Sequence, residues 1–137
     1  AASTMRRLIA WSASLALMAA SGALGAQIES LPGAEGIWES LPNMYSGYLD
    51  LPGTQKHVFY LFVESTAADA PLAMWTNGGP GCSGFIGLMT EQGPFRPEEN
   101  GTLSLNPSSW HQAANMLFIE QPVGVGFSYS DNSHVVV

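Results

Sequence analysis

The sequence predicts an α/β fold, with a mixed sheet that begins as an antiparallel hairpin and continues as a strand–helix–strand unit. The hairpin is the first of the observations behind this prediction. Residues 45–50 alternate between apolar and polar positions, and residues 57–64 form a second β-like run. The Leu-Pro-Gly-Thr sequence at 51–54 is typical of a turn, so we expect the two runs to pair with each other.

The second observation is a glycine-rich turn between an apolar run and a helix. Residues 71–76 form a short apolar run, which predicts a strand buried on both faces. This strand ends at the Asn-Gly-Gly-Pro-Gly sequence of 77–81, through which no helix or strand can continue. Residues 83–90 predict a helix, and Ser83 stands where it could cap the helix start.

The third observation is another apolar strand at residues 115–120, which follows a polar segment at 91–109 that we expect to be a loop. No element is predicted in the tail, residues 123–137. The central strands of an α/β sheet need helices on both faces, and only one clear helix is predicted. We therefore expect residues 27–137 to be the incomplete N-terminal part of an α/β domain, unable to fold stably by itself.

The N-terminal residues predict a secretory signal peptide. Met5, Arg6 and Arg7 precede an apolar stretch at 8–20, which leads into small residues. The apolar stretch is shorter than the roughly 20 residues of a membrane span, so no span is expected in the mature chain. We assign residues 1–26 to the signal peptide and to residues preceding it, and we expect the protein in the secretory pathway.

Composition is consistent with this route and argues against nucleic-acid binding. Four basic and eleven acidic residues give a net charge of −7, which repels phosphate backbones. The single cysteine, Cys82, predicts a disulfide with a partner outside these 137 residues, because secreted proteins meet oxidising conditions. Asn100 begins an Asn-Gly-Thr sequon and is a candidate glycosylation site.

The glycine-rich turn allows three interpretations. Gly79, Gly81 and Gly84 match a dinucleotide-binding pattern, but Pro80 lacks the N–H that a pyrophosphate would need. No acidic residue closes a second strand about 20 residues further on, as ribose binding would require. The turn could also be purely structural. The third interpretation is an oxyanion hole, because glycines after an early strand expose backbone N–H groups to a developing negative charge.

Four sequence blocks favour the third interpretation through a family resemblance. They are Asn-Gly-Gly-Pro-Gly-Cys-Ser at 77–83, Glu-Gln-Gly-Pro-Phe at 91–95, Asn-Pro-Ser-Ser-Trp at 106–110 and Gln-Pro-Val-Gly-Val-Gly-Phe-Ser-Tyr-Ser at 121–130. In this order, from about residue 45 to residue 132, they resemble the N-terminal third of serine carboxypeptidases. The resemblance implies an α/β-hydrolase fold and the release of C-terminal residues from peptides. It implies no metal and no cofactor.

The resemblance also implies roles for individual residues. Gly79 would donate its N–H to the oxyanion. The side-chain amide of Asn77 and the N–H of Gly78 would hold the free carboxylate of a peptide substrate, with Glu91 hydrogen-bonding that carboxylate while itself protonated. Since a carboxyl group donates only when protonated, substrate binding should weaken as Glu91 ionises.

The catalytic triad is not recognisable in the sequence. No Gly-x-Ser-x-Gly nucleophile elbow occurs, and the nearest match, around Ser128, lacks its second glycine, so Ser128 is interpreted as structural. His57, His111 and His134 come too early to be the base, because in α/β hydrolases the histidine follows the acid. Gly84 departs from the second serine of many members. The nucleophile, acid and base are expected beyond residue 137.

Two alternative functions remain open at this level. A carboxypeptidase-like acyltransferase would share the fold and much of the glycine loop while transferring an acyl group to an alcohol. A non-catalytic secreted binding protein would lack the nucleophile elbow altogether. The residue preference, the oligomeric state and the choice between vacuole or lysosome and the cell exterior are not determined by these residues.

Overall fold

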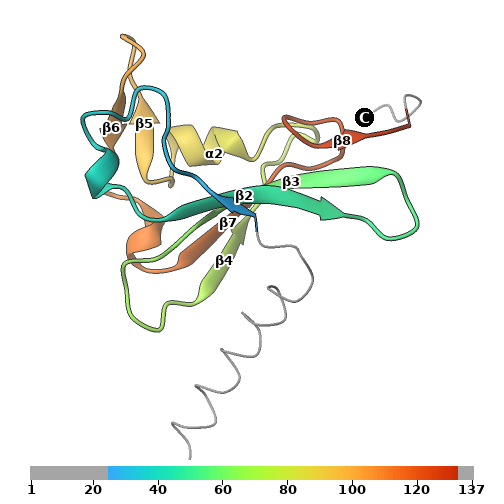
Figure 1. Cartoon of the computed structure of the whole chain (residues 1–137), viewed down its shortest axis with the longest axis horizontal. Helices are drawn as coiled ribbons and strands as arrows, with labels where there is room; N and C mark the ends of the chain where they lie inside the picture. Colours follow the sequence, from blue (N-terminus) through green and yellow to red (C-terminus); the bar gives the residue numbers. More distant parts are fainter. Residues whose placement is uncertain (1–24, 133–137) are drawn as a thin grey trace, which may run out of the picture.

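The computed structural model describes residues 25–132, and its main feature is a six-stranded mixed sheet (Figure 1). The strands follow the order β1-β2-β3-β7-β4, and a further short strand, β8, pairs with the start of β3. Their bounds are β1 (Ala26–Gln27), β2 (Met44–Asp50), β3 (Lys56–Val63), β4 (Leu72–Trp75), β7 (Asn115–Ile119) and β8 (Tyr129–Ser130). The remaining elements are the helix α2 (Phe85–Thr90), the 3₁₀ helices η1 (Trp38–Ser40) and η2 (Trp110–Gln112), and the strands β5 (Phe95–Pro97) and β6 (Leu103–Leu105).

The predicted hairpin is confirmed. β2 and β3 pair antiparallel along their whole length, from Met44 opposite Val63 to Asp50 opposite His57. The alternating pattern of β2 and the Leu-Pro-Gly-Thr turn are enough to specify this local pairing, because turn geometry and side-chain alternation together set the register. β3 then pairs antiparallel with β7 on its other edge and so links the hairpin to the rest of the sheet.

The strand–helix–strand unit is also confirmed. β4 and β7 are parallel neighbours, with Trp75 opposite Phe118, and α2 lies in the connection between them. The helix begins at Phe85, two residues later than predicted. Just before it, Gly84 lies so close to β7 that an added Cβ would sit 2.4 Å from the carbonyl oxygen of Ile119. A residue with a side chain would not fit at this position without a shift of the backbone.

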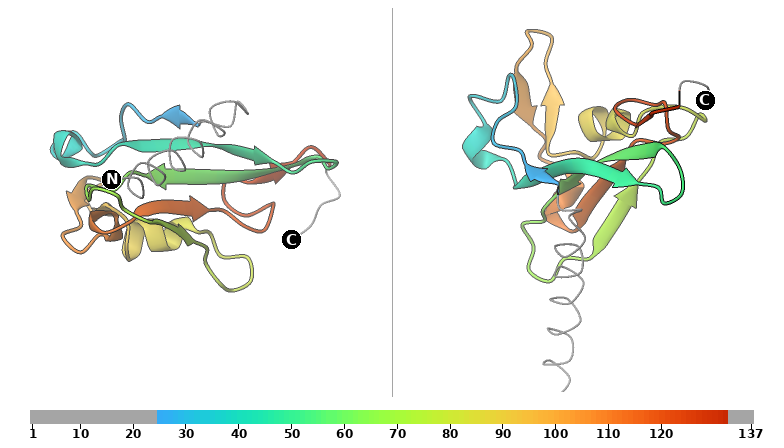
Figure 2. Two further views of the ribbon diagram at one scale, coloured as in Figure 1. Left: turned by 90° about the horizontal axis from the view of Figure 1, so that it is seen from below. Right: turned by 45° about the vertical axis from the view of Figure 1, so that its right-hand side comes forward.

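The prediction that β4 is buried on both faces is wrong. Leu72 is 54% exposed and Met74 is 64% exposed, whereas Ala73 and Trp75 pack against the core. β4 is the last strand on its side of the sheet in the described part of the chain, and α2 and β5 cover one face only (Figures 1 and 2). The apolar run of β4 therefore has one face against the core and one face exposed.

Two stretches predicted to lack regular structure contain short strands. Within residues 91–109, β5 and β6 form a separate antiparallel pair, with Phe95 opposite Leu105. In the tail, β8 adds to the edge of β3. These strands are two or three residues long, too short for a recognisable alternation. Long-range contacts stabilise them, such as the 2.7 Å hydrogen bond from the Leu103 N–H to the Gly33 carbonyl.

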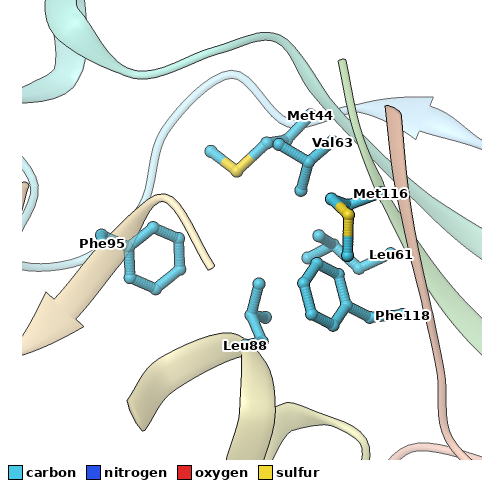
Figure 3. Close-up of a cluster of buried hydrophobic side chains, with 7 residues drawn as sticks. All are labelled: Met44, Leu61, Val63, Leu88, Phe95, Met116 and Phe118. Atoms are coloured by element: carbon cyan, nitrogen blue, oxygen red, sulfur yellow. The ribbon is translucent and has the colours of Figure 1, made fainter. Parts of the chain in front are cut away.

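Within residues 25–132, an apolar core lies between the large sheet and the layer formed by α2 and β5 (Figure 3). The buried side chains come from β2, β3, β7, α2 and β5: Met44, Leu61, Val63, Leu88, Phe95, Met116 and Phe118. Phe118 and Val63 are completely buried. This core fixes α2, and with it the glycine-rich turn that precedes the helix, against the end of the sheet.

The predicted signal peptide lies almost entirely outside the described residues. Of residues 1–26, only Gly25 and Ala26 are described, and Ala26, the first residue of β1, pairs with Ser46 of β2. The signal peptide therefore stays a prediction. Within residues 25–132, no helix has the length and apolar character needed to cross a bilayer. His134 and the last three residues also lie outside the described part.

Candidate functional site

The candidate site forms where the parallel strands β4 and β7 end side by side. The glycine loop leaves the end of β4, and Gln121-Pro122 leaves the end of β7. Together they line an open depression of about 530 Å³. Its lining residues are Asn77, Gly78, Gly79, Pro80, Gly81, Gln121 and Pro122. Ligands commonly bind at the carboxyl ends of parallel strands, and this arrangement is of that kind.

The three residues predicted to contact substrate from the loop are brought together in this depression. The side-chain oxygen of Asn77 accepts a 3.0 Å hydrogen bond from the indole N–H of Trp75, which directs the amide NH₂ away from the indole. Gly79 has φ of 129°, a conformation that residues with a side chain rarely adopt. The loop is closed by a 3.3 Å hydrogen bond from the Cys82 N–H to the Gly78 carbonyl.

Glu91 does not line the depression. It follows the last residue of α2, and its side chain is exposed. Its backbone carbonyl accepts hydrogen bonds from Arg96, at 2.9 Å, and from the side-chain amide of Asn106, at 3.0 Å. The role predicted for the Glu91 carboxyl group stays a prediction.

A buried carboxylate behind the depression was missed by the sequence interpretation. Glu120 is completely buried and immediately precedes Gln121. One carboxylate oxygen accepts a short hydrogen bond from the Ser83 hydroxyl, and the other accepts the Phe127 N–H at 2.5 Å. The available signal was an ionisable residue at the end of an apolar strand, but its partners lie 37 and 7 residues away in sequence.

The two serines near this carboxylate have structural contacts. The formal N-cap position of α2 is Gly84, but the prediction that Ser83 caps the helix start is confirmed by its side-chain contact with the first turn. Ser83 lies one residue earlier, where its oxygen still accepts the Phe85 N–H at 3.1 Å. Ser128 is buried, donates its hydroxyl to the Glu120 carbonyl at 2.6 Å and accepts the Phe59 N–H at 2.8 Å. Its interpretation as a structural residue agrees with these contacts.

The described histidines lie away from the depression. His57 lies next to the turn of the hairpin, 2.6 Å from Asp50 and 3.2 Å from Asp131. The hydrogen bond with Asp50 has the largest effect and the one with Asp131 the next largest, and both raise the pKa of His57 above its usual 6.5. His111 is buried beside Ser109, and burial lowers its pKa below 6.5.

The remaining candidate positions are on the surface. Cys82 is an exposed free thiol at the end of the glycine loop. Asn100 is exposed in the turn between β5 and β6, and its side-chain oxygen accepts both the N–H and the hydroxyl of Thr102, at 3.0 and 2.7 Å. Both positions are accessible, and the predicted disulfide and glycan stay predictions.

Comparison with known proteins identifies the family. The family model described as serine carboxypeptidase matches residues 32–136. The chain is 47% identical to the lysosomal protective protein of Mus musculus over 113 residues, 80% of this chain and 23% of the relative. It is 50% identical to carboxypeptidase Y homolog A of Sclerotinia sclerotiorum over 91 residues, 65% of this chain and 17% of the relative.

A solved structure agrees with these matches. The crystal structure of Kex1(delta)p, a prohormone-processing carboxypeptidase from Saccharomyces cerevisiae, superposes with a TM-score of 0.65 at 35% identity. The match covers 76% of this chain and 24% of that one. The chain belongs to the serine carboxypeptidase family. It spans no more than about a quarter of the length of these relatives.

Proposed function

We propose that the chain forms the substrate-receiving part of a serine-type carboxypeptidase with an α/β-hydrolase fold. The observation that carries the proposal is the depression at the ends of β4 and β7, in which Asn77, Gly78 and Gly79 lie together. A glycine loop after an early strand of a mixed sheet is where α/β hydrolases supply one oxyanion donor. Family membership supports the reaction class.

In this proposal the depression recognises the end of a peptide chain. The NH₂ group of Asn77 and the N–H of Gly78 donate to the terminal carboxylate, and the N–H of Gly79 donates to the oxyanion of the tetrahedral intermediate. Fixed donors directed at a developing charge lower the barrier, because they need no reorganisation during the reaction. Glu91 would approach the same carboxylate as a protonated donor.

The nucleophile, acid and base would come from the part of the relatives that this chain does not span, because its 137 residues contain no Gly-x-Ser-x-Gly segment. We further propose entry into the secretory pathway through residues 1–26 and residence in a vacuole, a lysosome or the cell exterior. The predicted leader, the accessible Asn100 sequon and the exposed Cys82 support this route. A disulfide from Cys82 would then need a cysteine outside these residues.

Peptide hydrolysis by the full-length protein tests the function. We expect cleavage of a peptide with a free C-terminal carboxylate and little cleavage of the same peptide as its C-terminal amide, which lacks the group held by Asn77 and Gly78. Equal cleavage of both would contradict the carboxylate assignment. Transfer of an acyl group to an added alcohol, without peptide hydrolysis, would assign the protein to the acyltransferases instead.

The pH profile tests Glu91 separately. We expect KM of the wild type to rise with pH, because an ionised carboxyl group no longer donates to the substrate carboxylate and repels it. Glu91→Gln keeps a donor at every pH and should flatten this rise. An unchanged pH profile in Glu91→Gln would exclude the role proposed for Glu91 and leave the carboxypeptidase assignment intact.

A further inference from the structure

Glu120 is an ionisable residue that the proposed reaction leaves without a role. Its side chain is completely buried, a rare environment for a glutamate unless its carboxylate is paired. In the part of the chain described here, the ion pairs involve His57 and not Glu120. Its carboxylate is instead held by a hydroxyl and a backbone amide, both neutral donors.

The two donors come from the two segments that line the depression. Ser83 ends the glycine loop 77–83, which carries Asn77, Gly78 and Gly79. Phe127 belongs to the segment 121–128, which begins with the lining residues Gln121 and Pro122. The carboxylate of Glu120 is therefore a direct link between the two segments that line the depression, here called its walls.

The anchorage of Glu120 itself is firm. Its N–H donates to the Phe59 carbonyl at 3.0 Å, and its carbonyl accepts the Ser128 hydroxyl at 2.6 Å. Segment 121–128 also approaches the carboxylate closely, since a Cβ added to Gly126 would lie 1.4 Å from the oxygen that accepts the Phe127 N–H. The carboxylate thus has a position fixed by β3 and can hold both walls at a set separation.

We propose that Glu120 is a positioning residue, whose carboxylate sets the placement of the glycine loop, and hence of the Gly79 N–H, relative to segment 121–128. The inference rests on the proposed function. Oxyanion donors act when they lie 2.7–3.1 Å from the developing charge. A displacement of about 1 Å can lower the rate by about 100-fold. Because Ser83 lies only four residues from Gly79, we expect loss of its link to Glu120 to displace the Gly79 N–H on this scale.

The chemistry of the link predicts different effects for two substitutions. Ser83→Ala removes the donor on the loop side and leaves the Phe127 contact in place. Glu120→Gln removes the negative charge. The new side chain can accept the Phe127 N–H only if its NH₂ group faces Ser83, and the hydrogen bond between residues 83 and 120 is then reversed in direction. Both changes weaken the same link, so their effects on the rate should not add.

The experiment measures kcat, KM and the thermal unfolding midpoint of the full-length protein. Ser83→Ala, Glu120→Gln and the double variant are compared with Ser109→Ala. Ser109 is the matched control: it is buried, and its hydroxyl donates to the Gln92 carbonyl at 3.0 Å, away from the depression. We expect kcat to fall about tenfold to 100-fold in Ser83→Ala and Glu120→Gln, with the double variant no worse than the poorer single variant.

Inhibition by a peptide boronic acid, which places a tetrahedral oxyanion in the site, supplies a second readout. Its affinity should fall in parallel with kcat in Ser83→Ala, while Ser109→Ala loses thermal stability with kcat within about twofold of wild type. Unchanged kcat in folded Ser83→Ala would overturn the inference and leave the carboxypeptidase assignment standing. If Glu120→Gln fails to fold, Ser83→Ala decides alone. A wild-type protein without peptidase activity would overturn both.

Discussion

Replacing Gly126 by alanine tests how closely segment 121–128 packs on the carboxylate of Glu120. Gly126 has φ of 53°, in the left-handed region that glycine adopts without penalty. An added Cβ would lie 1.4 Å from Oε2 of Glu120 and 2.2 Å from its carboxyl carbon. Both distances are far inside van der Waals contact, so the carboxylate or the segment must move.

Two contributions add in this variant. An alanine in the left-handed conformation costs roughly 1–2 kcal/mol. Displacement of the carboxylate also breaks at least the bond from the Phe127 N–H, and hydrogen bonds to charged groups contribute about 1.5–3 kcal/mol each. We therefore expect Gly126→Ala to lower the free energy of unfolding by about 2.5–5 kcal/mol.

Gly53→Ala is the matched control. Gly53 has φ of 74°, and an added Cβ there would meet no atom within 4 Å. This variant has the backbone penalty alone, about 1–2 kcal/mol. Urea denaturation of the full-length protein, followed by tryptophan fluorescence, measures both changes. Equal losses in the two variants would refute the close packing of segment 121–128 on Glu120.

Three further substitutions test other parts of the structure. Because hydrogen bonds with Asp50 and Asp131 raise the folded-state pKa of His57 above 6.5, its stabilising effect is complete below about pH 6.5 and is lost as pH rises through the folded-state pKa. The unfolding temperature of the wild type should therefore exceed that of His57→Asn by more at pH 5 than at pH 8, and an equal excess would contradict the ion pairs. His111 supplies the opposite sign: burial lowers its pKa, so the wild type should exceed His111→Asn by more at pH 8 than at pH 5. In the core, Phe118→Ala should lower the free energy of unfolding by about 3–5 kcal/mol in urea denaturation, and a loss below about 1 kcal/mol would contradict the complete burial of Phe118.

The agreement between sequence and structure is best where neighbouring residues carry the information. The hairpin of β2 and β3 follows from alternation and a Leu-Pro-Gly-Thr turn, and the strand at 115–119 follows from a compact apolar run. The glycine loop was located for the same reason. Asn77, Gly78 and Gly79 were expected to act together, and they line one depression because they are consecutive in the chain.

The errors occur where the environment of a residue depends on distant parts of the chain. The exposure of Leu72 and Met74 depends on what covers β4, and no local pattern states this. β5, β6 and β8 are stabilised by pairing and by long-range hydrogen bonds, not by a pattern of their own. Glu91 illustrates the same limit, since its block was recognised but its side chain is not among those that line the depression.

The sequence by itself determined the family, the positions of the main strands along the chain and the loop that carries the proposed oxyanion donor. All three depend on short contiguous segments. Only the tertiary structure decided that Gln121 and Pro122 line the same depression as the glycine loop and that the buried Glu120 bonds to both segments. A carboxylate is stable in such a place only if donors surround it, and here Ser83 and Phe127 supply them. Folding brings these donors together from separate segments, so the sequence around Glu120 could not predict them.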